Sequence, residues 1–192
     1  DGLSGVSIEN IKSSSKNFRW KKIIAEFFYS KNQAGYPWSA PTESGDEDYY
    51  NNYYYEDGWS YKHLGIGSPL ITAHKDAKEN QAFNESDYFI NNRVIAGHIG
   101  LSGEMSGIDF LTKISYSRNY GTFGTSIYGK STGIIRGTNS TNIFIPVNQL
   151  SIYFEGMKKI NNNYTTGFAT FLDQGRLLEK SFGLILKIKK SL

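Results

Sequence analysis

The last eleven residues of the chain alternate between apolar and polar side chains, and this alternation limits the possible folds more than any other feature. Successive side chains of an extended strand point to opposite sides of a sheet. One side of this segment therefore collects the apolar residues Phe182, Leu184, Leu186, Ile188 and Leu192. The other side collects Ser181, Gly183, Lys187 and Lys189, and only Ile185 and Lys190 interrupt the pattern. The segment predicts a β-strand with one apolar face and one wet face.

The order of residue types in this strand, polar-x-Gly-x-x-apolar-x-apolar, is similar to the signal that the bacterial barrel-assembly machinery reads on a last strand. Leu192 stands where that signal has an aromatic residue. The pattern favours a transmembrane β-barrel, whose strands need apolar residues only at every second position. A half-buried strand of a soluble β-sandwich has the same alternation, so that fold stays open as the alternative.

Composition narrows the class of protein further. Hydrophobic residues make up 39% of the 192 residues, and no stretch approaches the roughly 20 consecutive apolar residues of a spanning helix. Aromatic residues reach 15%, with 20 Gly and only 4 Pro, which is typical of a protein with many strands. A net charge of +3 with interleaved signs argues against a nucleic-acid partner. The absence of cysteine excludes disulfides and thiolate metal sites.

Seven segments of the chain have the length and pattern of membrane-crossing strands, each long enough for the roughly 9 to 11 residues that such a strand needs. We expect these strands at residues 2–12, 16–29, 91–104, 108–119, 148–157, 164–172 and 178–190. On the fourth of them, Phe110, Ile114 and Tyr116 fall on one face, and Lys113 falls on the other. Aromatic residues gather near strand ends, as in the interfacial girdles of membrane barrels. They are Phe18, Trp20, Phe28, Tyr29, Tyr88, Phe89 and Tyr164.

The connections between these strands alternate in length. Short turns rich in Gly, Asn, Asp and Ser are expected around residues 13–15, 106–107, 161–163 and 173–176. Long loops are expected at about 30–90 and 120–147. An outer-membrane barrel has short periplasmic turns and long extracellular loops. This asymmetry predicts one transmembrane β-barrel segment over residues 1–192, located in a bacterial outer membrane and in contact with its lipid.

An odd number of strands is unusual for a bacterial barrel. Because the chain also begins within an expected strand, we expect a longer precursor and interpret the chain as the carboxy-terminal part of a larger barrel. The alternative is a complete barrel with one further strand at residues 65–74 or 132–145. The missing strands can also come from another chain.

The most biased segment lies at residues 46–63, where tyrosines and Trp59 are interleaved with acidic and amide side chains. Aromatic rings stack on the apolar faces of sugars, and the polar side chains hydrogen-bond hydroxyl groups. The segment therefore predicts a glycan-binding loop formed by Tyr53, Tyr54, Tyr55, Trp59 and Tyr61. The alternative is structural, with the rings folding the loop into the barrel mouth as a plug.

A second group of candidate residues consists of cations and a histidine on or near the strands. We expect Arg93, His98, Lys113 and Arg118 to line a lumen or its rim, which favours anionic solutes or acidic polysaccharide. Pairing with carboxylates such as Glu104 and Glu155 is the structural alternative. The acidic and histidine residues match no metal-binding spacing. We expect no metal and no cofactor.

Catalysis receives little support from the sequence. His98 and Ser102 share a face of one strand, but four residues along a strand separate them by about 13 Å. No Gly-x-Ser-x-Gly elbow occurs in the chain. We therefore expect a non-enzymatic protein, and a lipid-acting barrel enzyme is the weaker alternative.

Three stretches of the chain carry a family resemblance: residues 57–70, 91–103 and 115–123. They resemble the Wzi-type capsule-assembly proteins, particularly the versions found in Bacteroidetes. The resemblance covers roughly residues 53–123 and the final strand. It implies an outer-membrane barrel of about 18 strands without enzymatic activity, of which this chain is the last third or more. The resemblance further implies that the remaining strands and any periplasmic helices lie in an amino-terminal part.

The founding members of this family help hold capsular polysaccharide at the cell surface, so the resemblance implies that role here. In the Bacteroidetes branch, porins and subunits of larger envelope complexes are further alternatives. These alternatives imply solutes or other envelope proteins as partners in place of a polysaccharide.

Overall fold

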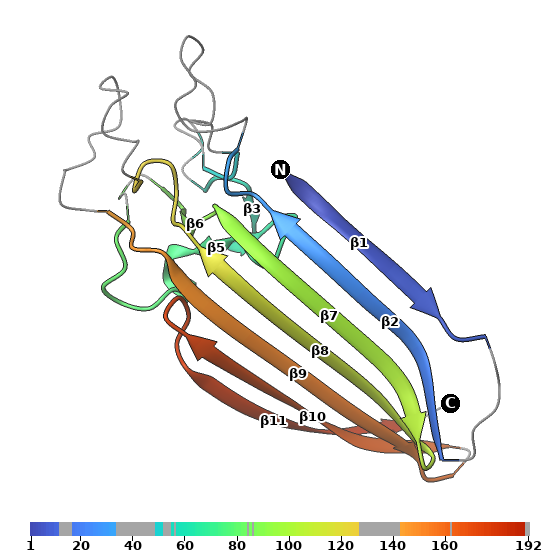
Figure 1. Ribbon diagram of the computed structural model, residues 1–192. Helices are drawn as coiled ribbons and strands as arrows, with labels where there is room; N and C mark the ends of the chain where they lie inside the picture. Colours follow the sequence, from blue (N-terminus) through green and yellow to red (C-terminus); the bar gives the residue numbers. More distant parts are fainter. Residues whose placement is uncertain are drawn as a thin grey trace.

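The structure is a computed structural model that describes residues 1–11, 17–33, 49–51, 55, 57–83, 85, 87–126, 143–161 and 163–190. These residues form an all-β fold in which seven long strands build one antiparallel sheet. The strands are β1 (Gly2–Glu9), β2 (Phe18–Tyr29), β7 (Val94–Met105), β8 (Ile108–Asn119), β9 (Val147–Lys159), β10 (Tyr164–Gly175) and β11 (Ser181–Lys190). Each long strand pairs with the next one along the chain, as Figure 1 shows.

All seven expected strands are present, with ends that differ by a few residues from the prediction. The sheet is open, and β1 and β11 form its two edges. The all-β class and the antiparallel arrangement are thus confirmed, whereas a closed barrel is not seen in these residues.

The two ends of the sheet differ in their connections. Residues 106–107 and 160–163 join strands at one end, as does the connection from β1 to β2; we call this the turn end. The long connections that follow β2 and β8 leave the opposite end, here called the loop end (Figure 1). The last turn differs from its predicted place, because β10 continues through Gly175 and reverses at residues 176–180 of the loop end.

The connection after β2 contains a small folded unit, which we call the lobe (residues 57–91). It includes β3 (Ser60–Tyr61), β4 (Leu64–Gly65), β5 (Thr72–Ala73), the 3-10 turn η1 (His74–Asp76) and β6 (Phe89–Asn91). β3 pairs with β4, and β5 pairs with β6, in two separate small sheets. Residues 65–74 therefore supply no further strand to the main sheet. Of the other segment proposed for such a strand, residues 132–142 lie outside the described residues and residues 143–145 form none.

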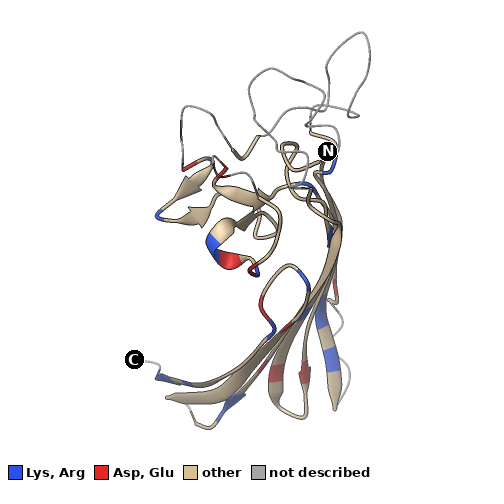
Figure 2. Ribbon diagram, turned by 90° about the vertical axis from the view of Figure 1, so that its left-hand side faces the viewer, with Lys and Arg blue, Asp and Glu red and all other residues tan. Residues whose placement is uncertain are grey.

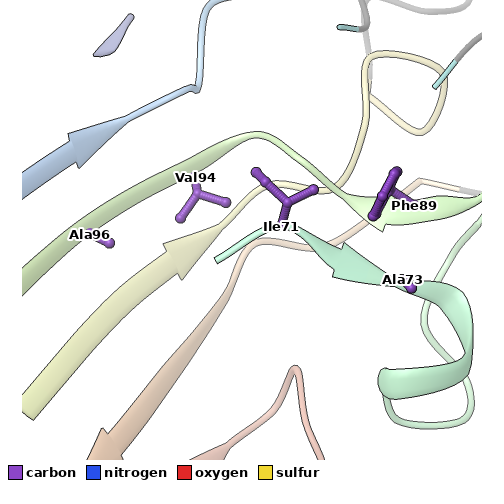
Figure 3. Close-up of a cluster of buried hydrophobic side chains, with 5 residues drawn as sticks. All are labelled: Ile71, Ala73, Phe89, Val94 and Ala96. Atoms are coloured by element: carbon purple, nitrogen blue, oxygen red, sulfur yellow. The ribbon is translucent and has the colours of Figure 1, made fainter. Parts of the chain in front are cut away.

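The main sheet is curved, and the lobe lies against its concave side near the loop end (Figure 2). One hydrophobic cluster joins Ile71, Ala73 and Phe89 of the lobe to Val94 and Ala96 of β7 (Figure 3). A second cluster joins Ile90 to Phe144, Val147 and Leu177. The lobe thus supplies the buried core that a single curved sheet lacks.

The lobe is also attached to the far side of the sheet, at the turn between β10 and β11. The Lys78 ammonium donates to the Gly175 carbonyl oxygen at 3.0 Å, and the Gln81 amide donates to the Arg176 carbonyl oxygen at 2.7 Å. Ala77 forms an isolated antiparallel bridge with Leu178. The lobe therefore spans the concave side from β7 to the β10–β11 turn.

The strand register shows which side chains share a face, because directly paired residues of an antiparallel sheet project to the same side. One row crosses all seven strands and contains only apolar side chains: Val6, Ala25, Ile99, Ile114, Ile152, Leu172 and Phe182. The adjacent row projects to the opposite face: Gly5, Glu26, His98, Ser115, Ser151, Asp173 and Ser181. The second row shares its face with Val94 and Ala96, so it belongs to the concave side that carries the lobe.

Candidate functional site

The convex face of the sheet is an exposed apolar surface. Ile99, Ile114 and Phe182 belong to the row of apolar side chains that crosses all seven strands, and they are 58%, 42% and 72% exposed. Among the described residues of the seven strands, the register places only Arg118, Lys158 and Lys190 as charged side chains on this face. Each of them stands within two residues of a strand end. Exposed apolar surfaces of this extent are typical of protein–protein or membrane interaction sites.

No described part of the chain folds into a helix with the length and apolar character needed to cross a membrane.

The concave face carries the opposite chemistry. Arg19 pairs with Glu104 at 3.2 Å, and Lys187 pairs with Glu155 at 2.7 Å. The Tyr153 hydroxyl donates to Glu155, which it meets on the same strand. Glu104 and Glu155 thus pair with cations, as in the structural alternative predicted from the sequence. Their partners are Arg19 and Lys187, which are not among the four candidates named there.

His98 and Lys113 both project from the concave face. The Lys113 ammonium lies 5.8 Å from the centre of the Tyr153 ring. The His98 Nδ1 lies 2.7 Å from the Ser115 hydroxyl oxygen on the neighbouring strand. Spacing along one strand cannot reveal this Ser–His contact, because the register of two strands brings Ser115 of β8 opposite His98 of β7.

The Ser115–His98 pair can exchange a proton, but a catalytic serine site needs further groups. His98 has no second hydrogen-bond partner among the residues that the structure describes. A serine nucleophile also needs donors for a developing oxyanion, and the N–H groups of paired strands are used in the interstrand ladder.

Arg93 and Arg118 lie at the loop end, at the rim of the sheet. Arg93 is only 3% exposed; its guanidinium donates to the Lys31 carbonyl oxygen at 2.7 Å and lies 5.3 Å from the Phe123 ring. Arg118 is paired with Ile95 and projects from the convex face. Of the four residues expected at a lumen or rim, two therefore lie on the concave face and two at the rim.

A buried polar junction beside Arg93 joins the lobe to the connection after β8. The Gly121 N–H donates to the Asn91 side-chain oxygen at 3.1 Å, and the Asn91 amide donates to the Asn119 side-chain oxygen at 3.0 Å. Asn91 and Asn119 are both fully buried. Because buried polar groups are stable only when hydrogen-bonded, this junction fixes the base of both long connections. The sequence alone does not predict this junction.

The aromatic candidates divide between the surface and the regions that are not described. Tyr55, Trp59 and Tyr61 are 73%, 57% and 66% exposed. Tyr53 and Tyr54 lie outside the described residues. The neighbouring Leu64 is 69% exposed and extends this surface. It is not among the residues predicted from the sequence.

The β3–β4 hairpin presents these rings in a fixed way. Lys62 and His63 form its turn with φ angles of 49° and 64°, the positive values that a tight two-residue reversal requires. The Trp59 N–H donates to the Tyr50 carbonyl oxygen at 2.7 Å. The Tyr50 ring packs edge-on against Phe89 at 6.1 Å, and its burial raises the pKa of its hydroxyl group. Tyr50 therefore has a structural role, whereas Trp59 and Tyr61 face outward.

Within the described residues, no group of three or more His, Cys, Asp or Glu side chains is arranged to hold a metal ion. The fold and site together define an antiparallel β-sheet with an exposed apolar convex face, a charged concave face and an aromatic hairpin near its loop end. Comparisons of the chain with protein-family models, curated proteins and solved structures find no match.

Proposed function

We propose that this sheet is part of the wall of a bacterial outer-membrane β-barrel that associates with a surface polysaccharide without acting as an enzyme. The observation that carries the membrane placement is the unbroken apolar row from Val6 to Phe182, next to a row that contains Glu26, His98 and Asp173. A barrel wall has this arrangement because alternate side chains face lipid and an aqueous interior.

The direction of the edge strands supports a larger barrel. β1 and β11 both run from the loop end to the turn end, because five strands separate them and every pairing is antiparallel. Pairing these two edges directly would create a parallel seam. Since an open edge cannot face hydrocarbon, antiparallel closure needs an odd number of additional strands, supplied by another part of the protein or by another chain.

The polysaccharide part of the proposal rests on the exposed rings of the β3–β4 hairpin. The hairpin follows β2, so in the proposed orientation it belongs to the extracellular side. Trp59 and Tyr61 are exposed rings that can stack on sugars, and the Lys62 ammonium at the turn lies over the Tyr61 ring, 5.5 Å from its centre.

Replacing both Trp59 and Tyr61 with alanine should weaken retention of capsular polysaccharide at the cell surface. At about 1 kcal/mol for each lost ring contact, the apparent affinity should fall roughly thirtyfold. The measurement is a titration of purified capsular polysaccharide against the full-length protein in detergent, together with the amount of capsule retained on cells. The Trp59→Phe/Tyr61→Phe variant keeps both rings and should bind nearly normally. Equal retention by the alanine variant would remove the assigned role of the hairpin.

A channel is the second candidate, and the charged concave face favours it. Ion pairs such as Lys187–Glu155 would line a polar passage, although the lobe covers part of this face (Figure 2). Conductance in planar bilayers tests this candidate, and a silent barrel would count against it.

A further inference from the structure

Two cations at the loop end lie close to one aromatic ring. The Lys31 ammonium is 4.8 Å from the centre of the Tyr120 ring, and the Arg118 guanidinium is 5.9 Å from the same ring. Lys31 follows β2, whereas Arg118 and Tyr120 come from the end of β8, so β7 separates the two sources in the sheet. The ring therefore brings together two cations from different parts of the chain at one place on the rim.

Among the described residues, these two cations have no carboxylate partner, in contrast to comparable groups of the concave face. Lys21 and Lys22 pair with Asp109 and Glu9 at 2.5 and 3.0 Å. Neither Lys31 nor Arg118 forms an ion pair with a residue that the structure describes. The Asp1 carboxylate, at this end of β1, accepts a hydrogen bond from the Asn32 N–H at 3.3 Å. Lys31 and Arg118 are thus available to an external anion.

Their position indicates which anion they meet. Arg118 belongs to the same convex face as Ile114 and Tyr116, and it stands next to the last residue of β8. It therefore lies just beyond the apolar band, at the depth where lipid headgroups begin in the proposed membrane orientation. Interfacial cations and aromatic residues are typical of this depth, and polybasic surfaces bind anionic headgroups there.

We propose that Lys31 and Arg118 bind a phosphate group of an anionic glycolipid in the outer leaflet. This inference rests on the proposed membrane placement and is independent of polysaccharide binding by the hairpin. The arginine fork matches two phosphate oxygens, and the lysine adds a point charge. Tyr120 keeps the two cations near each other, because both lie within 6 Å of its ring centre.

The test uses the full-length protein, purified in detergent and freed of lipid, and measures its binding to a bisphosphorylated lipid A and to the same glycolipid with its phosphates removed. We expect the unmodified protein to prefer the phosphorylated glycolipid. The Lys31→Gln/Arg118→Gln variant should bind it roughly thirtyfold more weakly, as expected for the loss of two interfacial cations. The Lys31→Arg/Arg118→Lys variant keeps both charges and should retain most of the binding.

Lys158 and Lys190 provide a matched control, because both lie on the convex face at the turn end, which faces the other leaflet. Their glutamine variants should leave glycolipid binding unchanged. Equal binding of the phosphorylated and dephosphorylated glycolipids would overturn the inference, as would unchanged binding by the Lys31→Gln/Arg118→Gln variant or equal binding of phosphatidylglycerol vesicles.

Membrane partitioning separates this inference from the proposed function. Protein that does not partition into detergent after cell fractionation contradicts both the membrane placement and the glycolipid site. Protein that partitions normally but shows no preference for the phosphorylated glycolipid contradicts the glycolipid site alone.

Discussion

Replacing Ile114 with lysine is expected to destabilise the protein in a lipid bilayer by about 2 to 4 kcal/mol, the cost of a lysine on the lipid face near the midplane. Ile114 lies in the middle of β8 and belongs to the row of apolar side chains that crosses the sheet. The measurement is the free energy of unfolding by urea in vesicles, with the amount of protein assembled in the outer membrane as a second readout.

Leu111 provides the control for this substitution, because it belongs to the same strand but projects from the opposite face. The register pairs Leu111 with Glu155, so a lysine at this position gains a nearby carboxylate and an aqueous surrounding. Leu111→Lys should therefore change stability by less than about 1 kcal/mol. If the concave face were instead the buried face of a soluble β-sandwich, Leu111→Lys would cost more stability than Ile114→Lys. That result would contradict the proposed membrane wall.

Replacing Gly121 with alanine should have an effect of similar size. Gly121 has a φ of +76°, which costs a residue with a side chain about 1 to 2 kcal/mol. An added Cβ would also lie 2.6 Å from both the Phe144 Cβ and the Thr125 hydroxyl oxygen. Crowding of this kind adds roughly 1 to 3 kcal/mol. The polar junction with Asn91 should open, which amide hydrogen exchange over residues 119–126 would detect.

Gly107→Ala separates the two contributions. Gly107 lies in the turn between β7 and β8 with a φ of +78°, and nothing lies within 4 Å of its added Cβ. This variant should lose only the conformational part of the stability. If both alanine variants lose the same stability, the crowding at Gly121 is absent.

The strands were predictable from the sequence because each of them alternates over many residues. In β11, the sequence correctly separated Phe182, Leu184 and Leu186 from Ser181 and Gly183, and the register confirms the two faces. The all-β class followed from the same signal. The lobe was not predictable, because β3, β4 and β5 have only two residues each and carry no periodicity.

The lobe also explains where the alternation failed. Ile24 and Phe28 are apolar on a face that also carries Lys22 and Glu26, and in the structure Phe28 packs against the hydrophobic cluster beneath the lobe. A short alternating pattern cannot show that a distant segment will cover part of a polar face. The register shift at residues 20–22 of β2 is a further irregularity without a sequence signal.

The residue types of the candidate site could be predicted from the sequence, but most of their contacts could not. The aromatic segment was found because its composition is extreme, and Trp59 and Tyr61 are indeed exposed. The partner of His98 lies on the neighbouring strand β8, and the Lys187 partner of Glu155 lies on β11, beyond β10, so both contacts depend on the register and could not be read from spacing along the chain.

Attachment of the lobe at both β7 and the β10–β11 turn has a mechanical consequence. A curved sheet held only by its own ladder can flatten or tighten, because its twist and bending are soft. Here the lobe connects two distant parts of the curved sheet. Lys78 and Gln81 attach it to the β10–β11 turn, and the Phe89 cluster attaches it to β7. The radius of curvature, and with it the width of any enclosure that this wall completes, is then set by the length of the lobe.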